Sequence, residues 1–434
     1  MSLRFVSTRN TAGAPAVTAS TAIRAGLADD GGLYVPTALP RLNPSDFDAA
    51  TSPAEVARIL LAPFFDGDPL AEKLEQICAE TFHFPLPLQQ LDDGPAVLEL
   101  FHGPTAAFKD IGAGFLAACI QRIEASVEHP LTVLVATSGD TGSAVAAAFH
   151  RRPGIEVTIL FPSGLVSSRQ AHLLSCWDGN VRTYAVDGVF DDCQRMVKDA
   201  FADKQITASR RLSSANSINI GRLLPQMVYY ATASLHAYRH GLAPPGFIIP
   251  SGNLGNAFAC LMAREIGLPI GDVILATNAN LTMAEYLDSG EWRPRGSVAT
   301  LASAMDVGDP SNMERVFWRF SDHARVSAAL KVIAIDDPAI RSAIRQGPQR
   351  WGQIWCPHTA TAISAWEQLP APVQAQPWIA VATAHPAKFN DIVEPLIGEE
   401  VPLPAEMQRL LALPARADSM RAEPGALRDA LMQG

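Results

Sequence analysis

Lysine is scarce in this 434-residue sequence, which has only six lysines among its 34 basic residues. The net charge of −10 argues against nucleic acid and against an acidic membrane surface as partners. No apolar run approaches the roughly 18 residues that a membrane span needs, and no signal-peptide pattern opens the sequence. We therefore expect a cytoplasmic protein that binds neither nucleic acid nor membrane.

Motifs of several common enzyme classes are absent. The sequence has no Gly-Lys dipeptide and no Gly-x-Gly-x-x-Gly, which excludes a Walker A loop and a Rossmann fingerprint. It has no Gly-x-Ser-x-Gly, the nucleophile elbow of serine hydrolases. The six cysteines show no Cys-x-x-Cys spacing and the histidines are scattered, so we expect buried free thiols and no metal site.

The chain is 48% apolar and long enough for two or three domains. Residues 1–95 indicate a small N-terminal domain that ends in a polar linker at 89–94. Beyond it, apolar strands alternate with alanine-rich helices, which is typical of α/β proteins with open, mostly parallel sheets. Strands are predicted at 96–100, 131–136, 155–161, 181–186, 247–250, 273–277, 331–335 and 378–382.

A Pro-Pro-Gly break at 244–246 suggests how this region divides. We expect a first α/β cofactor and substrate domain over 96–243 and a second α/β domain with a phosphate cup over 244–400. Residues 401–434 would form a helical C-terminal tail. The true boundaries of the two α/β domains are expected to be discontinuous in sequence.

Lys109 stands where a predicted strand gives way to a predicted helix with an apolar residue at every fourth position. An ammonium in a desolvated site is costly, and desolvation lowers the pKa of a lysine, as an imine-forming lysine requires. Taken alone, a lysine that extends to solvent is the simpler interpretation. The residues at the other strand ends are needed to choose between an imine-forming lysine and a solvent-exposed one.

Two glycine-rich turns, at 137–143 and 251–257, each follow a predicted strand and open a predicted helix. Such a junction gathers backbone N–H groups and a helix dipole at one point, which makes an anion site. Each turn alone is better explained as a tight connection with a capped helix. In open α/β sheets, however, ligands collect at the carboxyl ends of strands, where both turns and Lys109 lie.

The side chains of the two turns differ in chemistry. Asn253 and Asn256 add uncharged donors, which suit a phosphate held mainly by dipoles. Ser138, Asp140 and Thr141 add hydroxyls and one carboxylate, which suit a polar organic ligand better than a bare phosphate.

A fourth strand end carries a hydroxyl, that of Thr383, whose simpler interpretation is a turn or helix cap. An imine-forming lysine, a dipolar phosphate cup and a neutral hydroxyl together describe a pyridoxal 5′-phosphate site. Its aldehyde would take Lys109, its phosphate the turn at 252–256, and its ring nitrogen Thr383. Because a hydroxyl does not force ring protonation, the electron sink would be milder than with an aspartate.

At these residues the chain resembles the threonine synthases, of the β-family (fold type II) of pyridoxal-phosphate enzymes. Generic dehydratases would share only the lysine and the glycine turns. The resemblance implies the two open, mostly parallel α/β domains of that fold type with a small N-terminal domain. The similar segments span nearly the whole chain: 31–36, 101–110, 136–145, 190–194, 214–222, 250–256, 304–315 and 383–389.

The resemblance implies a role for each matching residue. Lys109 would be the Schiff-base and catalytic residue. The cofactor phosphate and ring would be bound by Gly252, Asn253, Leu254, Gly255, Asn256 and Thr383. The substrate carboxylate would lie at Ser138, Gly139, Asp140 and Thr141. The substrate pocket would be lined by Asn216, Ser217, Asn219 and Arg222.

Two positions depart from the family pattern. Ser163 stands where members often carry a lysine, and Ala106 replaces a larger apolar residue. The first departure leaves open which cation holds a substrate phosphate, with Arg169 and Lys388 as candidates.

The implied function is a lyase that converts O-phospho-L-homoserine and water to L-threonine and phosphate, the last step of threonine biosynthesis. The reaction combines a γ-elimination with addition of water at Cβ, and the enzyme would act as a monomer or homodimer. One alternative is a serine/threonine dehydratase or another β-replacement enzyme. A more distant one is a non-catalytic homologue that binds a phospho-metabolite.

Overall fold

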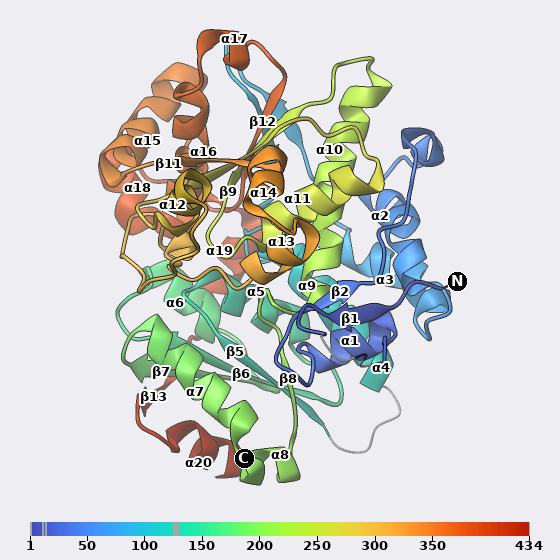
Figure 1. Ribbon diagram of the computed structural model, residues 1–434. Coiled ribbons are helices and arrows are strands. Elements are labelled where there is room, and N and C mark those ends of the chain that lie inside the picture. The colour runs from blue at the N-terminus through green and yellow to red at the C-terminus, as the bar shows by residue number, and fades with distance from the viewer. Residues whose placement is uncertain (1, 11–12, 14, 125–129, 434) are drawn as a thin grey trace.

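The computed structural model describes residues 2–10, 13, 15–124 and 130–433. Two open sheets form the upper and lower halves of the molecule, and a small N-terminal unit packs at their side (Figure 1). No helix in these ranges is long and apolar enough to cross a membrane.

The upper sheet has the strand order β11-β10-β9-β12-β4-β3, in which only β3 runs antiparallel to its neighbour. Helix α16 packs against three strands of this sheet, β9, β10 and β12. The strands are β3 (Leu88–Gln90), β4 (Ala96–Glu99), β9 (Gly246–Pro250), β10 (Val273–Thr277), β11 (Lys331–Ala334) and β12 (Trp378–Ala382). The helices of this half are α10 (Met227–Arg239), α11 (Gly255–Ile266), α12 (Thr282–Ser289), α13 (Met313–Arg319), α14 (His323–Ala329), α15 (Asp337–Trp351), α16 (Pro357–Glu367), α17 (Ala371–Gln374) and α18 (Asn390–Ile397), with the 3-10 turns η4 (Leu224–Gln226), η5 (Ser303–Met305) and η6 (Pro386–Phe389).

The lower sheet has the order β13-β7-β6-β5-β8 and is parallel throughout. Every residue of β5 is buried, as expected for a strand covered on both faces. The strands are β5 (Leu131–Ala136), β6 (Ile155–Pro162), β7 (Val181–Asp187), β8 (Arg211–Ser214) and β13 (Asp418–Arg421). The helices of this half are α4 (Lys109–Glu124), α5 (Asp140–Phe149), α6 (Ser168–Ser175), α7 (Phe190–Ala202), α8 (Lys204–Ser209), α9 (Ile220–Leu223), α19 (Ala405–Leu411) and α20 (Ala426–Gln433).

The N-terminal unit is built on an antiparallel pair of short strands and packs on α4 through α1 and α3. Its helix α2 begins at a complete capping box, in which Ser52 and Glu55 satisfy each other's backbone N–H groups. The elements are β1 (Phe5–Ser7), β2 (Tyr34–Pro36), α1 (Ala19–Ala25), α2 (Pro53–Leu61) and α3 (Leu74–Thr81), with the 3-10 turns η1 (Pro44–Phe47), η2 (Ala62–Phe65) and η3 (Ala71–Lys73).

All eight predicted α/β strands are confirmed within two residues, but β3, β8 and β13 were not predicted. Strand β3 lies in the expected polar linker, and β13 lies in the expected helical tail. Both are polar edge strands in which only one side chain, Leu88 or Met420, is not exposed, so pairing with a neighbour rather than an apolar pattern makes them strands.

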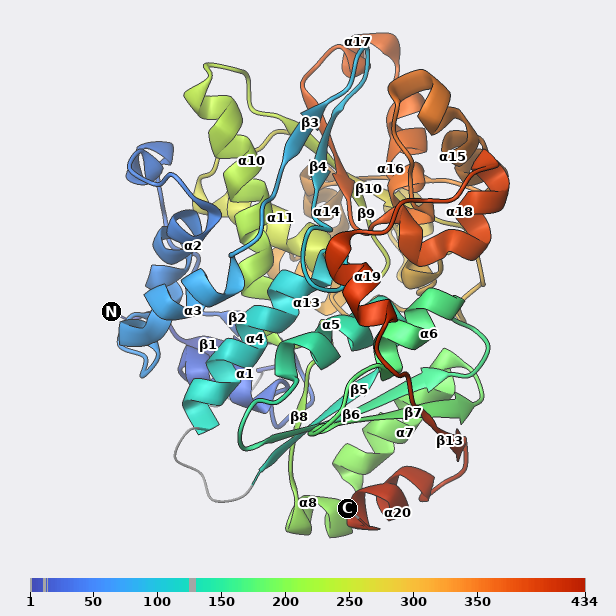
Figure 2. The same cartoon turned by 180° about the vertical axis from the view of Figure 1, so that it is seen from behind.

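The two sheets are also assembled differently from the expected ranges. Strand β4 was placed in the domain at 96–243, but it pairs with β12 of the upper sheet. Strand β13, from the C-terminal segment, pairs with β7 of the lower sheet. Figure 2 shows this C-terminal segment crossing from the upper to the lower half, past α19 and α6. The chain therefore passes between the halves more than once.

Arg315 joins the N-terminal unit to the α/β body. It is fully buried on α13. Its guanidinium donates to the carbonyl of Tyr34 in β2, at 3.1 and 3.2 Å, and to the carbonyl of Ile218 at 2.6 Å. It also donates to the Asn312 side chain. One side chain thus satisfies acceptors from three separate segments.

Arg315→Leu is expected to lower the free energy of unfolding by about 3 kcal/mol, because it leaves several buried acceptors without donors. Urea denaturation of the two proteins side by side measures the change. The matched control is Arg341→Leu on the exposed face of α15; its effect should stay within about 0.5 kcal/mol. Equal midpoints for the two variants would contradict the anchoring role of Arg315.

Candidate active site

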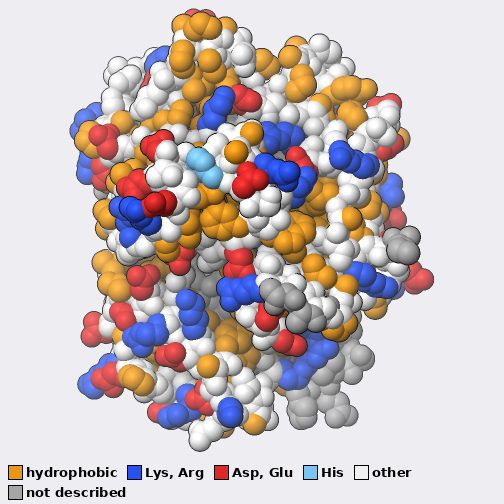
Figure 3. Space-filling model, viewed as in Figure 1, with side chains coloured by type: hydrophobic (Ala, Val, Ile, Leu, Met, Phe, Trp, Pro, Cys, Tyr) orange, Lys and Arg blue, Asp and Glu red, His pale blue; other side chains and the backbone are white. Residues whose placement is uncertain are grey.

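A pocket of about 390 Å³ lies where the carboxyl ends of the strands of both sheets meet. Segments that follow β4, β5, β8, β9 and β12 all contribute to its wall. Figure 3 shows the molecular surface hollowed between the upper and lower halves. The predicted site residues that line the pocket are Lys109, Ser138, Asp140, Thr141, Asn216, Ser217, Arg222, Gly252, Asn253, Leu254, Gly255, Asn256 and Thr383.

Lys109 is the first residue of α4 and lies half-buried at the pocket wall. Desolvation lowers the pKa of its amine to about 8. The neighbouring cations Lys388 and Arg222 act in the same direction, while the Asp140 carboxylate opposes them. An amine with this pKa is available to accept protons near neutral pH.

The loop before Lys109 is held by the buried carboxylate of Asp110. It accepts hydrogen bonds from the backbone N–H and the hydroxyl of Thr105, at 2.9 and 2.5 Å. Gly103 lies so close that a Cβ there would be 2.6 Å from the same carboxylate. The Gly-Pro break in the sequence therefore lets the chain turn tightly against Asp110 and present Lys109 at the start of the helix.

The turn after β9 forms a cup at the N-terminus of α11. Leu254 adopts a left-handed conformation with φ of 61°, which turns the backbone into the helix. A Cβ on Gly252 would lie 2.7 Å from the backbone Cα of Met305, so only glycine fits there. The first N–H groups of α11 have no acceptors within the helix and open onto the pocket.

Two buried donors beside this cup have no hydrogen-bond partner among the described residues. They are the hydroxyl of Ser251 and Nδ2 of Asn256. The Asn256 amide is oriented by Tyr230, whose hydroxyl donates to Oδ1 at 2.7 Å. A phosphate would satisfy these donors together with the helix N-terminus, so the residues present fit the phosphate of a pyridoxal cofactor.

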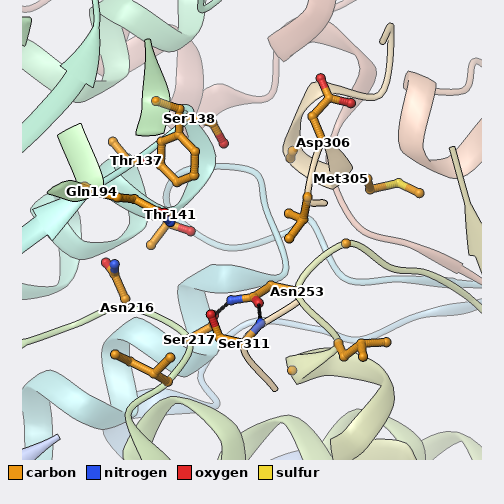
Figure 4. Close-up of a pocket in the computed structure, with 18 of the residues that line it drawn as sticks. Thr137, Ser138, Thr141, Gln194, Asn216, Ser217, Asn253, Met305, Asp306 and Ser311 are labelled. Carbon is orange, nitrogen blue, oxygen red and sulfur yellow. Dashed lines mark hydrogen bonds between the residues drawn. The ribbon is translucent and has the colours of Figure 1, made fainter. Parts of the chain in front are cut away.

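Asn253 serves a different purpose from its neighbours. Its Nδ2 donates to the Ser217 hydroxyl at 2.6 Å, and its Oδ1 accepts the backbone N–H of Ser311 at 2.6 Å, as Figure 4 shows. The side chain was expected as a phosphate donor, but these bonds commit it to joining the cup to the segments at 217 and 311.

The turn after β5 presents Ser138 and Thr141 to the pocket (Figure 4). Gly139 does not line the pocket, although it was predicted to. Its φ is 131°, and a Cβ there would lie 2.6 Å from the Gln170 amide. Its N–H donates to the Thr137 hydroxyl at 3.0 Å, so Gly139 shapes the turn.

Asp140 opens α5 and is buried in an ion pair. Its Oδ1 lies 2.8 Å from Nζ of Lys388 and accepts Nε2 of Gln170 at 3.0 Å. Burial alone would raise the pKa of this carboxyl, but Lys388 and Lys109 hold it well below its usual value. The carboxylate is therefore charged throughout the physiological range.

Arg222 and Asn219 were both predicted to line the substrate pocket, and only Arg222 does. Asn219 is fully buried and caps α9, with its side chain bonded to Ile23 and Ser214. Arg222 is 2% exposed, has no ion-pair partner in the described part of the chain, and keeps a free buried Nε. Burial lowers its pKa to about 10.

The two cations suggested for a substrate phosphate are both committed elsewhere. Arg169 lies 3.2 Å from Glu394 and donates to the Ala387 carbonyl at 2.8 Å. Lys388 is paired with Asp140. Neither lines the pocket; its cationic lining residues besides Lys109 are Lys198, Arg222 and Arg295.

Gln194, Asp306 and His358 are among the lining residues that were not assigned from the sequence. Gln194 and Asp306 lie in segments already noted for their resemblance, at 190–194 and 304–315, so a signal existed for both. Burial raises the pKa of Asp306 to about 6, against the effect of its bonds to Thr300 and Asn278. Nothing in the sequence indicated that His358 lines the pocket, because a histidine at the start of an apolar helix is usually interpreted as a core residue.

Comparisons with known proteins agree with this geometry. Residues 86–383 match the family model "Pyridoxal-phosphate dependent enzyme", residues 4–82 "Threonine synthase N terminus", and residues 359–431 "Threonine synthase, C-terminal". The threonine synthases of Serratia marcescens and Escherichia coli are 39% and 38% identical, over 96% of both chains in each case.

The chain belongs to the threonine synthase family.

Solved structures extend the agreement to the fold. Threonine synthase from Escherichia coli aligns with a TM-score of 0.89, at 36% identity over 99% of both chains. Pyridoxal-phosphate-bound threonine synthase from Brucella melitensis aligns with a TM-score of 0.91, at 34% identity over 100% of this chain and 99% of that one. The predicted family, α/β fold class, function as a threonine synthase and pyridoxal phosphate cofactor are thereby confirmed.

Gly252→Ala is expected to weaken binding of pyridoxal phosphate at least tenfold, because the new Cβ would displace the backbone at Met305 and deform the cup. Titration of the near-visible absorbance of the bound cofactor measures the loss. The control is Gly114→Ala within α4, where the nearest atom to the new Cβ is 3.9 Å away. Unchanged affinity in Gly252→Ala would contradict the cup as the phosphate site.

The pH dependence of stability should reflect His358. Burial lowers its pKa to about 4, from an ordinary value of 6.5. Between pH 6.5 and 4 the unfolded chain therefore binds a proton that the folded chain does not. The contribution of neutral His358 to the free energy of unfolding is therefore complete above pH 6.5. It decreases as the pH falls to about 4, by up to about 3 kcal/mol.

His358→Gln should flatten this slope in urea denaturation between pH 4 and 7. Half-buried His385, whose pKa desolvation also lowers to about 4, would retain its own share. His83→Gln on the surface is the control and should leave the slope unchanged. Identical slopes for wild type and His358→Gln would contradict the assignment.

Proposed function

We propose that this chain converts O-phospho-L-homoserine and water into L-threonine and inorganic phosphate. One observation carries the proposal: the pocket joins an amine of lowered pKa to two separate anion sites. The cup at 252–256 offers dipoles and neutral donors, whereas Arg222 offers a full charge without an ion-pair partner among the described residues. A phosphorylated cofactor and a phosphorylated substrate together require two such places.

The cofactor would be held from three sides. Lys109 would bind its aldehyde, the cup from Gly252 to Asn256 its phosphate, and the Thr383 hydroxyl its ring nitrogen. Thr383 lies at the end of β12, and its carbonyl accepts the Phe108 N–H at 2.8 Å, so this strand end and the lysine loop are fixed to each other. When bound, pyridoxal phosphate supplies an electron sink for negative charge on the substrate carbons.

Lys109 would carry the protons. Its neutral amine accepts the proton from Cα of the substrate, releases that proton, and, neutral again, accepts the one from Cβ. Its ammonium later returns a proton to carbon. A pKa of about 8 suits both directions near neutral pH, because neither form of the amine is rare. Water, after the phosphate has left Cγ, adds at Cβ.

The substrate would be oriented by its two anionic ends. The hydroxyls of Ser138 and Thr141 and the start of α5 suit the α-carboxylate. Arg222, which lines the same pocket as Asn216 and Ser217, suits the phosphate, since a guanidinium binds phosphate with paired donors. The three-residue set of Arg222, Asn216 and Ser217 replaces the earlier candidates Arg169 and Lys388.

We further propose that the enzyme works in the cytoplasm as a monomer or homodimer. All six cysteines are free and buried, which suits a reducing compartment.

Lys109→Ala should abolish turnover and remove the near-visible absorbance of the bound cofactor, since the other lysine at the pocket in the described residues, Lys198, is exposed on α7. The measurement is release of phosphate and formation of threonine from O-phospho-L-homoserine by the purified holoenzyme. Lys73→Ala, on the surface of the N-terminal unit, is the control. Full activity in Lys109→Ala would end the proposal, and ammonia release from threonine by wild type would favour a dehydratase.

A further inference from the structure

Lys388 is the only lysine of the described chain that is completely buried. It follows β12, and its Nζ lies 2.8 Å from Oδ1 of Asp140 and 2.8 Å from the carbonyl oxygen of Thr105. Its own carbonyl accepts the Ser167 hydroxyl at 2.7 Å. Asp140 follows β5 of the lower sheet, while Thr105 follows β4 of the upper one. The ammonium therefore bridges the two sheets beneath the pocket.

Stability alone does not account for a charged pair in this place. Desolvation of two ions offsets most of their attraction, and apolar pairs of similar volume are often as stable. The Lys388 and Asp140 side chains are 0% and 3% exposed, so both have lost their hydration. The pair also lies beside the one amine whose protonation the proposed reaction requires.

The charges that face Lys109 come from three elements. Asp140 of α5 favours the ammonium form, whereas Lys388 of η6 and Arg222 of α9 disfavour it. The Phe108 ring, 5.6 Å from Nζ, adds a weak preference for the charged form. Among the described residues, Asp140 is thus the anion that favours the ammonium form of Lys109, and its effect depends on what else binds it.

The groups that face Asp140 are Lys388, Lys109 and His358, together with the Gln170 amide. His358 accepts the backbone N–H of Ala304 at Nε2 and is neutral at pH 7, because burial lowers its pKa to about 4. The full positive charges that act on the Asp140 carboxylate are therefore those of Lys388 and Lys109.

We propose that Lys388 is a positioning residue: it neutralises Asp140 across the two sheets and so leaves the amine of Lys109 free to accept a proton. The inference rests on the proposed role of Lys109. Without Lys388, the cation left to compensate the buried carboxylate is Lys109 itself, which then stays protonated to higher pH. When Asp140 is removed as well, the carboxylate that favours the ammonium form of Lys109 is gone.

The test follows the protonation of Lys109 without turnover. Full-length protein, freed of cofactor, is mixed with pyridoxal phosphate at a series of pH values. The rate at which near-visible absorbance develops tracks the unprotonated fraction of Lys109, because only the neutral amine reacts with an aldehyde. The acidic limb of kcat against pH in the holoenzyme provides a second readout.

Lys388→Met is expected to move the apparent pKa of this profile upward by about one pH unit, a tenfold change in the proton equilibrium. Asp140→Asn should move it downward, since the ammonium of Lys388 then acts unopposed. The double variant Lys388→Met/Asp140→Asn should return toward the wild-type value, which completes a double-mutant cycle. A purely structural role would give no such opposite shifts.

The matched control is Lys331→Met, which removes a lysine–aspartate pair of the same 2.8 Å length on the surface, with Asp272. Its profile should equal that of wild type. Coincident profiles for wild type and folded Lys388→Met would overturn the inference; if that variant does not fold, an Asp140→Asn profile that does not move downward would do so. Cofactor absorbance that persists in Lys109→Ala would instead refute the proposed function.

Discussion

Charge taken out of water is the constraint on which this active site depends. Lys109, Asp140, Lys388 and Arg222 carry full charges at or beneath the pocket, and three of them are almost entirely buried. Loops from both sheets surround these groups, and Lys388 and Asp140 compensate each other at 2.8 Å. Desolvation lowers the pKa of Lys109, which suits proton transfer. It also leaves the guanidinium of Arg222 poorly hydrated, which suits anion binding.

The fold brings these groups together by placing strand ends against strand ends. The carboxyl ends of β4, β9 and β12 face those of β5 and β8 across the pocket, so that every loop at this edge reaches the same volume. The N-terminal unit stabilises the arrangement from outside through the buried Arg315, which is bonded to β2 and to the segment that leads into α9. The position of Arg222 therefore depends also on contacts with the N-terminal unit.

Local sequence predicted much of this correctly. The eight central strands were found because parallel strands covered on both faces are short apolar runs. Lys109, the turn at 252–256 and Thr383 follow such runs, and all of them line the pocket. Strands β3 and β13 were missed since an edge strand can be polar when its partner supplies the pairing. Gly139 and Asn219 were assigned to the pocket because sequence proximity does not reveal which way a turn residue faces.

The sequence by itself determined the family, the alternation of strands and helices, and the chemical kinds of group at the strand ends, since these depend on residue type and short-range spacing. Only the tertiary structure decided which charges compensate one another. Lys388 and Asp140 are 248 positions apart in the chain, and their 2.8 Å contact exists because two separate sheets meet there. The same long-range packing left Arg222 without an ion-pair partner among the described residues and committed Arg169 to Glu394. Desolvation and pairing are properties of the folded interior, so no local pattern could have shown them.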